Sequence, residues 1–374
     1  MHDRADQSDA SPSNSTPRRR LTSLDAFRGL TVAGMILVNT PGSWDALLPP
    51  LRHAEWDGWT PTDQVFPAFL FIMGVAIPLA FASRRERGAS VLSLLFKIVW
   101  RTLALVVLGL VLNGFPNYDL ETLRYPGVLQ RIGICYGLAA LATLGLGRRG
   151  LVWLTALLLL GSWAIMMLVP APSFVAGDLS KVGSIASYVD RVLMHGHLYK
   201  PEYDPEGVLS TIPALASTLL GVLAGLWIQS GRGPSEVLAG LMFSGFCCVL
   251  GGWIWSGFYP INKALWTSSF VLWTGGWSLQ GLGLFYYLIE MKGWVRWSRP
   301  LVVFGINAIA AYVVAGLLSR CLGLWHPLGP DGPSCKEWIH QRVFLSWLQP
   351  PEIASFGFAL SFVFVCWLLM SLLA

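Results

Sequence analysis

The chain has 374 residues, a formal net charge of +5, 54% hydrophobic residues and only 13% charged residues. A soluble domain carries about 25% charged residues, so this composition excludes an ordinary soluble protein and indicates an integral membrane protein. The small positive charge comes without a basic-aromatic patch, which argues against a nucleic-acid partner. The six cysteines show no metal-ligand spacing such as CxxC, and no metal is expected.

Residues 1–20 are rich in Ser, Asp and Arg and contain no apolar run, which predicts a disordered tail. Residues 21–374 are predicted to form one transmembrane domain. Within it, ten apolar segments are each long enough to cross a ~30 Å hydrocarbon core. The sequence therefore predicts an all-α polytopic membrane protein, a bundle of about ten transmembrane helices. The segments lie near 24–41, 64–82, 91–113, 126–146, 151–170, 208–229, 235–257, 265–289, 300–323 and 352–373.

The short basic clusters all fall on one side of this arrangement, and by the positive-inside rule that side is the cytoplasm. Both termini are then cytoplasmic, and a bacterial inner membrane is the expected location. The opposite face holds the long loops 42–63, 171–207 and 324–351. Disulfides persist in the bacterial periplasm, so a bond between Cys321 and Cys335, which both lie near that face, is left open.

The first apolar segment carries polar groups at both ends. Asp25 and Arg28 are three residues apart, so on a helix they share a face and can pair. The pair is either a neutralised helix start or a place where Arg28 meets an anionic ligand from the cytoplasm. Asn39 lies about 21 Å from Asp25 along the helix axis, near the opposite face, where an amide is often a cap or an interhelical hydrogen bond.

The loop before the second segment contains His53, and the segment itself opens at Asp63. Histidine titrates near neutral pH and can take a proton from an amine or hydroxyl, although a lone loop histidine is more often only solvated. A carboxylate at a helix N-terminus is a normal cap. Asp63 can therefore cap its helix, orient a histidine, or do both.

Other polar residues lie in or near the membrane. Gln130 and Arg131 fall inside the fourth segment, where an arginine is costly unless it meets a partner or an aqueous cavity. Either Arg131 is functional or it forms a buried pair with an aspartate. The remaining candidates share the extracytoplasmic face and are expected to contact a substrate: Trp56, Asp204, Glu206, Asn262 and Lys263.

Five blocks of the sequence, in order, carry a resemblance to a known family. They read SLDAFRGLTVAGMILVN, HAEWDGWTPTDQVFPAFLFIMG, YPGVLQRIGICY, YDPEGVLSTIPA and NKALWTSSFVLWT. The chain resembles heparan-α-glucosaminide N-acetyltransferase and its bacterial relatives from about residue 20 to the C-terminus. The start SLDAFRG is weak because broader membrane acyltransferase families begin similarly, whereas the histidine-loop block is more specific.

The resemblance implies that residues 21–374 form a transmembrane acyltransferase domain. Such an enzyme moves the acetyl group of cytoplasmic acetyl-CoA to the amino group of a glucosamine-type saccharide on the extracytoplasmic face. It implies that His53 is the active-site histidine, with Asn39 beside it and Asp63 in support, and that the protein is a homodimer in the lipid bilayer. Contacts to acetyl-CoA are expected from Arg28, Asp25, Arg131 and Gln130.

Several alternatives stay open at this point. His53 can act as general base for direct transfer or can itself be acetylated first. The acceptor can instead be a hydroxyl of a cell-envelope glycan, which makes the protein an O-acyltransferase. A sugar transporter with Asp25 and Arg131 along its path is disfavoured because the sequence shows no internal repeat. A binding protein without turnover would not need His53.

Overall fold

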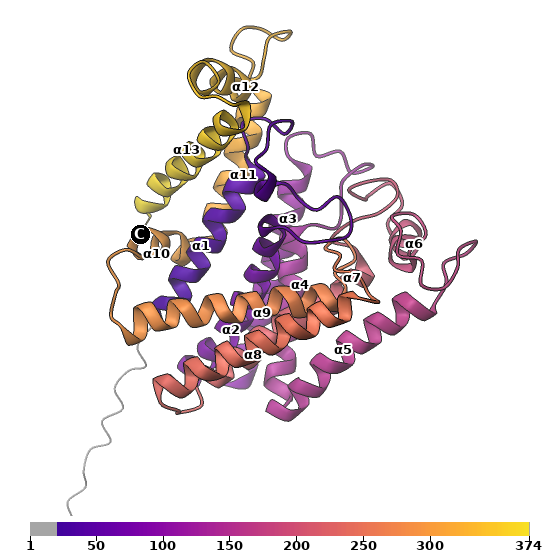
Figure 1. The fold of residues 1–374 in the computed structure, drawn as a ribbon, viewed down its shortest axis with the longest axis vertical. Helices are drawn as coiled ribbons and strands as arrows, with labels where there is room; N and C mark the ends of the chain where they lie inside the picture. Colours follow the sequence, from indigo (N-terminus) through magenta and orange to yellow (C-terminus); the bar gives the residue numbers. More distant parts are fainter. Residues whose placement is uncertain (1–20, 374) are drawn as a thin grey trace, which may run out of the picture.

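The computed structural model in Figure 1 describes residues 21–373, so the predicted tail 1–20 lies outside the described residues. Within these bounds the chain forms helices joined by loops and no β-sheet, and the all-α prediction is confirmed. Thirteen α-helices are described: α1 (Thr22–Asn39), α2 (Pro61–Glu86), α3 (Val91–Gly114), α4 (Val128–Gly145), α5 (Arg148–Leu168), α6 (Ile185–Leu193), α7 (Val208–Ile228), α8 (Pro234–Ser256), α9 (Ser268–Phe285), α10 (Arg299–Ile306), α11 (Ala308–Leu324), α12 (Cys335–Ile339) and α13 (Pro351–Ser371).

Short turns of other helical types complete the pattern. A 3-10 turn, Pro49–Leu51, lies in the loop after α1, and a π-helical turn, Tyr286–Met291, continues α9. A second π-helical turn, His340–Phe344, follows α12. The predicted outer loops 171–207 and 324–351 are thus partly helical, since they contain α6 and α12. All six cysteines are free, so the Cys321–Cys335 disulfide left open by the sequence is not formed.

Each of the ten predicted segments contains a helix, but fewer helices are long and apolar enough to cross a membrane. Seven meet that standard within residues 21–373: α2, α3, α4, α5, α7, α8 and α13. Counting α10 and α11 as one span, bent by 84° at Asn307, gives eight. Helices α1 and α9 fall outside this set, because several of the 18 residues in each helix are polar. The chain is an integral membrane protein, and the count of ten spans stays a prediction.

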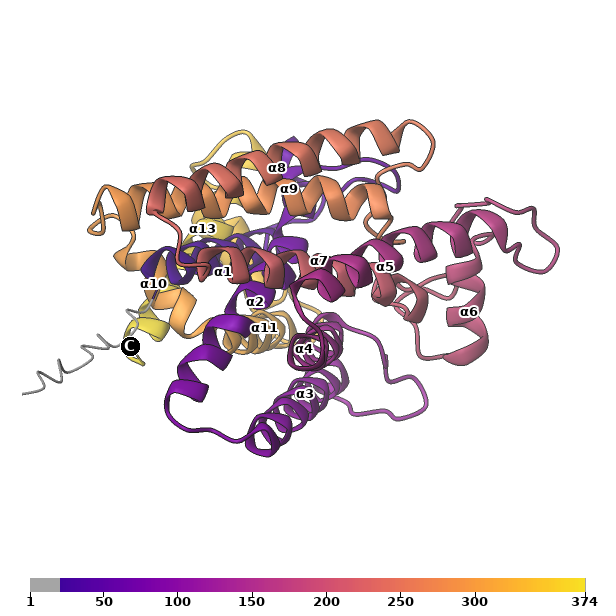
Figure 2. The same cartoon turned by 90° about the horizontal axis from the view of Figure 1, so that it is seen from below.

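Helices α2 and α7 lie at the centre of the bundle. In their most apolar stretches, 72% of α2 and 61% of α7 is buried, against 22% for α3 and for α8. The outer helices instead expose large apolar side chains such as Phe96 on α3 and Phe243 on α8, as lipid-facing helices do. Helices α8 and α9 lie side by side at one edge, and α3 and α4 at another (Figures 1 and 2).

Two pairs of helices approach so closely that only glycine fits between them. A Cβ added to Gly29 of α1 would lie 1.7 Å from the carbonyl oxygen of Leu301, and one on Gly305 would lie 1.9 Å from the carbonyl oxygen of Asp25. The same reciprocal contact joins α2 and α7 through Gly74 and Gly221. Small residues allow membrane helices to gain backbone packing in this way. These contacts fix α1 against α10 and α2 against α7.

A substitution at this contact tests the packing. Gly29→Ala should lower the free energy of unfolding by about 1–3 kcal/mol, because the added methyl overpacks the α1–α10 interface. Gly161→Ala on α5 is the matched control, since a Cβ there meets nothing within 4 Å. It should leave stability unchanged or raise it by about 0.5–1 kcal/mol. Thermal unfolding in detergent measures both, and equal melting temperatures for the two variants would contradict the contact.

Candidate active site

The beginning of α2 positions a carboxylate beside the loop histidine. Thr60 and Asp63 form a reciprocal capping box that starts the helix, and Pro61 occupies its first turn. Asp63 is buried, and its Oδ2 accepts hydrogen bonds from the backbone N–H groups of Ala54 and Thr60 at 3.0 and 3.2 Å. Its Oδ1 lies 2.6 Å from Nδ1 of His53. Since a carboxylate only accepts, the tautomer of His53 that donates to Asp63 carries its proton on Nδ1 and has a free Nε2.

The loop between α8 and α9 adds a cation to this pair. Lys263 Nζ donates to Asp63 Oδ1 at 3.2 Å and lies 3.1 Å from His53 Nδ1. Asn262 holds that loop in place, because its Nδ2 donates to Asp57 Oδ1 at 3.0 Å. Asn262 has no exposed surface, so it positions the loop and does not reach a ligand directly. The structure thus brings together His53, Asp63 and Lys263. The sequence suggested only His53 and Asp63 as partners.

These residues open onto a cavity of about 390 Å³, here called the histidine cavity. Asn39, the last residue of α1, also lines it, as the sequence predicted for a neighbour of His53. Aromatic rings form one wall: Trp56 and Tyr203 meet edge to face with centroids 5.1 Å apart. Trp56 Nε1 donates to the carbonyl of Leu179 at 2.9 Å, which fixes the indole plane.

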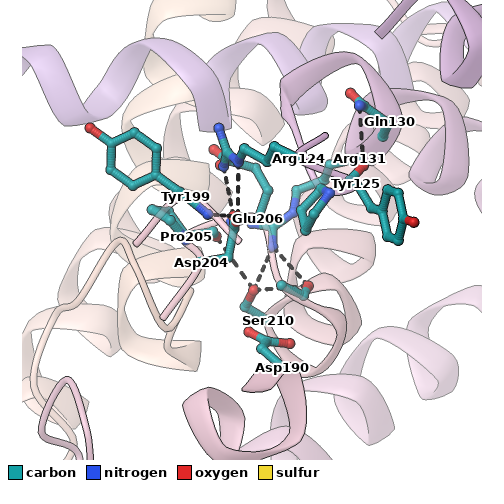
Figure 3. A network of polar contacts seen from close by, with 12 residues as sticks. Arg124, Tyr125, Gln130, Arg131, Asp190, Tyr199, Asp204, Pro205, Glu206 and Ser210 are labelled. Atoms are coloured by element: carbon teal, nitrogen blue, oxygen red, sulfur yellow. Dashed lines mark hydrogen bonds and ion pairs between the residues drawn. The ribbon is translucent and has the colours of Figure 1, made fainter. Parts of the chain in front are cut away.

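A second polar cluster, drawn in Figure 3, contributes Arg124 and Glu206 to the lining of the histidine cavity. Arg124 binds Asp204 through two hydrogen bonds, Nε to Oδ2 at 2.8 Å and Nη2 to Oδ1 at 2.6 Å, and also pairs with Glu206. Burial lowers the pKa of Arg124, but the two carboxylates raise it more, so the guanidinium stays charged. Glu206 and Arg124 line the cavity, whereas Asp204 is buried behind them.

Gln130 and Arg131 were expected to contact the cofactor, but neither lines the histidine cavity or the large cavity at the other end of α1. Arg131 is fully buried; its Nη2 donates to the carbonyl of Gly207 at 3.1 Å and to Ser210, and its guanidinium lies over the ring of Trp266. Gln130 donates to a backbone carbonyl in the preceding loop. Both residues thus contact groups at helix ends, while Nε and Nη1 of Arg131 have no hydrogen-bond partner within the described residues.

The cavity at the other end of α1, here called the arginine cavity, has a volume of about 350 Å³. Three arginines line it, Arg28 on α1, Arg84 on α2 and Arg101 on α3, and among residues 21–373 no carboxylate belongs to its lining. Arg28 donates to Asp25 Oδ1 at 3.1 Å and to the carbonyl of Gly305 at 3.2 Å. Asp25 is buried behind Arg28 and does not reach the cavity.

The sequence did not predict that three arginines line the cavities: Arg84 and Arg101 the arginine cavity, and Arg124 the histidine cavity. Arg84 belongs to a basic run that the sequence explained by topology alone. Arg101 is, with Lys97, one of the two charged residues inside the apolar segment 91–113, and an intramembrane arginine is itself a signal of function. Its guanidinium lies 4.8 Å from the ring centroid of Tyr136. Arg124 sits in a loop, where the sequence offers no comparable signal.

Comparison with known proteins identifies the family of the chain. A family model described as heparan-alpha-glucosaminide N-acetyltransferase, catalytic, matches residues 20–254. Heparan-alpha-glucosaminide N-acetyltransferases of Mus musculus and Homo sapiens are each 33% identical to the chain over 87% of its length. The chain spans 57% of the length of each of these relatives. The family match includes Asn39, His53 and Asp63. The chain therefore belongs to the heparan-alpha-glucosaminide N-acetyltransferase catalytic family.

Proposed function

We propose that this protein is a transmembrane acetyltransferase that moves the acetyl group of cytoplasmic acetyl-CoA to the amino group of a glucosamine-type saccharide on the extracytoplasmic face. The observation that carries the proposal is the pairing of His53 with the buried Asp63 at a cavity separate from the one lined by arginines. Family membership supports the same reaction, since both relatives bear the name of an N-acetyltransferase that acts on a glucosaminide.

The arginine cavity fits the donor. Coenzyme A carries several phosphate charges, and guanidinium groups bind phosphate oxygens in a bidentate manner. Arg28, Arg84 and Arg101 supply such groups without a competing carboxylate in the lining, and the remaining wall is mostly apolar, which suits the pantetheine arm. From Arg28 to Asn39 the α1 helix rises about 16 Å, a distance that an extended pantetheine arm covers. Asp25 contributes by holding Arg28.

The histidine cavity fits an aminosugar. Trp56 and Tyr203 offer ring faces and edges to the apolar side of a sugar, while Glu206 offers an oxygen to its ammonium or hydroxyl groups. Asp204 acts indirectly, because it fixes Arg124, which in turn holds Glu206. Asn262 likewise acts through Lys263 and the histidine loop. Lys263 lies within reach of both the cavity and the Asp63 carboxylate.

The chemistry follows from the tautomer of His53. Nε2 accepts a proton from the acceptor amine as its nitrogen bonds to the acyl carbonyl carbon, and Asp63 stabilises the imidazolium that forms. The carbon–sulfur bond then breaks, its electron pair leaves with sulfur, and the proton held by His53 passes to that sulfur. The amide of Asn39 lies where it can donate to the developing oxyanion. Acetylation of His53 itself remains the competing scheme.

The location and assembly of the protein form part of the same proposal. The basic clusters support cytoplasmic termini in a bacterial inner membrane. The arginine cavity, at the α1 N-terminus, then opens toward the cytoplasmic supply of acetyl-CoA, and loops 42–63, 171–207 and 324–351 lie on the extracytoplasmic side. A homodimer is proposed from the family resemblance.

The first test is activity. Purified protein in detergent, given acetyl-CoA and glucosamine, should form N-acetylglucosamine detectable by mass spectrometry, and His53→Ala should lower its rate by about 10²–10⁴-fold while acetyl-CoA still binds. Binding of acetyl-CoA without product would keep the acyltransferase and change the acceptor, for instance to a glycan hydroxyl. A wild type that neither binds acetyl-CoA nor forms product would favour a sugar transporter.

A second test addresses the tautomer. Asp63→Asn places an amide beside Nδ1 of His53, and an amide nitrogen that donates there leaves Nε2 protonated and unable to act as a base. The rate should fall by about 10²-fold or more with little change in KM for acetyl-CoA. Asp45→Asn, an exposed aspartate of the same loop that lines neither cavity, is the control. Unchanged kcat in Asp63→Asn would contradict the assigned pairing.

A third test addresses the donor site. Arg84→Gln and Arg101→Gln should each raise KM for acetyl-CoA by about 10-fold, since a charge-assisted hydrogen bond contributes about 1.5–3 kcal/mol. Their effect on KM for glucosamine should be small. Arg232→Gln serves as control because Arg232 is an exposed residue paired with Glu236 outside both cavities. Equal KM values for acetyl-CoA in all three variants would contradict phosphate binding in the arginine cavity.

A further inference from the structure

The two cavities are separated by a wall about one side chain thick. Met35 of α1 lines both cavities, and no other residue is shared by their linings. On α2, Phe66 faces the histidine cavity and Phe69 faces the arginine cavity, three residues or about 4.5 Å apart along the axis. On α4 the change occurs between the consecutive residues Val128 and Leu129.

Met35 is the one member of this wall that reaches both sides. Met35 is only 5% exposed, so its surface is almost fully covered although it lines both cavities. It stands two helical turns from Arg28 and about one turn, four residues or ~6 Å, from Asn39. Methionine is unbranched with three rotatable side-chain bonds, and it adapts its shape to irregular gaps. Met35 can therefore yield to a small group without movement of the helices.

We propose that Met35 sets the length of the acyl group that this protein transfers. The inference rests on the proposed function: a thioester held by its phosphates in the arginine cavity must present its acyl carbon to the histidine cavity, and the acyl group must pass Met35 to do so. An acetyl group fits beside the displaced methionine side chain. Each additional methylene needs further space in a passage whose lining on α2 and α4 includes the large side chains of Phe66, Phe69 and Leu129.

The size of the effect follows from the general cost of misfit. One added or missing methylene in an apolar site changes kcat/KM by about 10–200-fold. Met35→Ala removes three heavy atoms from the wall and should lower the ratio of acetyl to butyryl transfer by at least about 10-fold. Met35→Phe should do the opposite and lower acetyl transfer through kcat, because the rigid ring overfills the passage.

The experiment compares kcat/KM for acetyl-, propionyl-, butyryl- and hexanoyl-CoA with glucosamine as acceptor, using the full chain in detergent. Met73→Ala is the matched control, because Met73 is similarly buried and lines only the arginine cavity. That variant can weaken binding of every acyl-CoA but should leave the acetyl-to-butyryl ratio unchanged. If Met35→Ala does not fold, Met35→Val takes its place. Because this variant removes less volume, it should lower the acetyl-to-butyryl ratio by a smaller factor.

The outcomes separate this inference from the function beneath it. A ratio that falls in Met35→Ala or Met35→Val and stays constant in Met73→Ala supports the proposal. Acetyl transfer by the wild type with an unchanged ratio in both Met35 variants overturns the role of Met35 and leaves the acetyltransferase intact. An equal fall in Met73→Ala also overturns it. A wild type that transfers no acyl group at all overturns both.

Discussion

The carboxylate of Asp63 joins three parts of the chain: the start of α2, the histidine loop and the loop between α8 and α9. A buried carboxylate is costly unless hydrogen bonds and charges surround it. The N–H of Ala54, the imidazole of His53 and the ammonium of Lys263 together meet that requirement. The group that starts the central helix thus also orients the histidine, and neither can shift without the other.

The positions of the helices were predictable because long apolar segments in lipid have few alternatives to the helix. The count of ten spans stays a prediction, because α1 and α9 are less apolar than the other long helices and one segment is broken. Asp25, Arg28 and Asn39 lower the hydropathy of α1, and the ninth segment breaks at Asn307, where α10 meets α11 at 84°. No proline or glycine pattern marks that angle. It accompanies the close contact of Gly305 with α1, which is distant in sequence.

The candidate site likewise has a part that the sequence predicts and a part that depends on the packed helices. His53 and Asp63 are ten residues apart on one loop and helix start, so their pairing was accessible to a reading of the sequence. The approach of Lys263, 210 residues from His53, depends on the packed bundle. For Arg131 the sequence showed that a partner was required. Its actual partners are the backbone carbonyl of Gly207, the hydroxyl of Ser210 and the ring of Trp266, all distant from it in the sequence.

The contact of Arg28 with Gly305 also bears on how the protein is made, since the two residues are 277 positions apart. At ~5–20 residues per second, ribosomes need on the order of tens of seconds to add the intervening chain. Helix α1 is therefore made long before α10 exists to cover it. During that interval Arg28 has Asp25, three residues away, to offset its charge. This local pair is thus available before the bundle has formed.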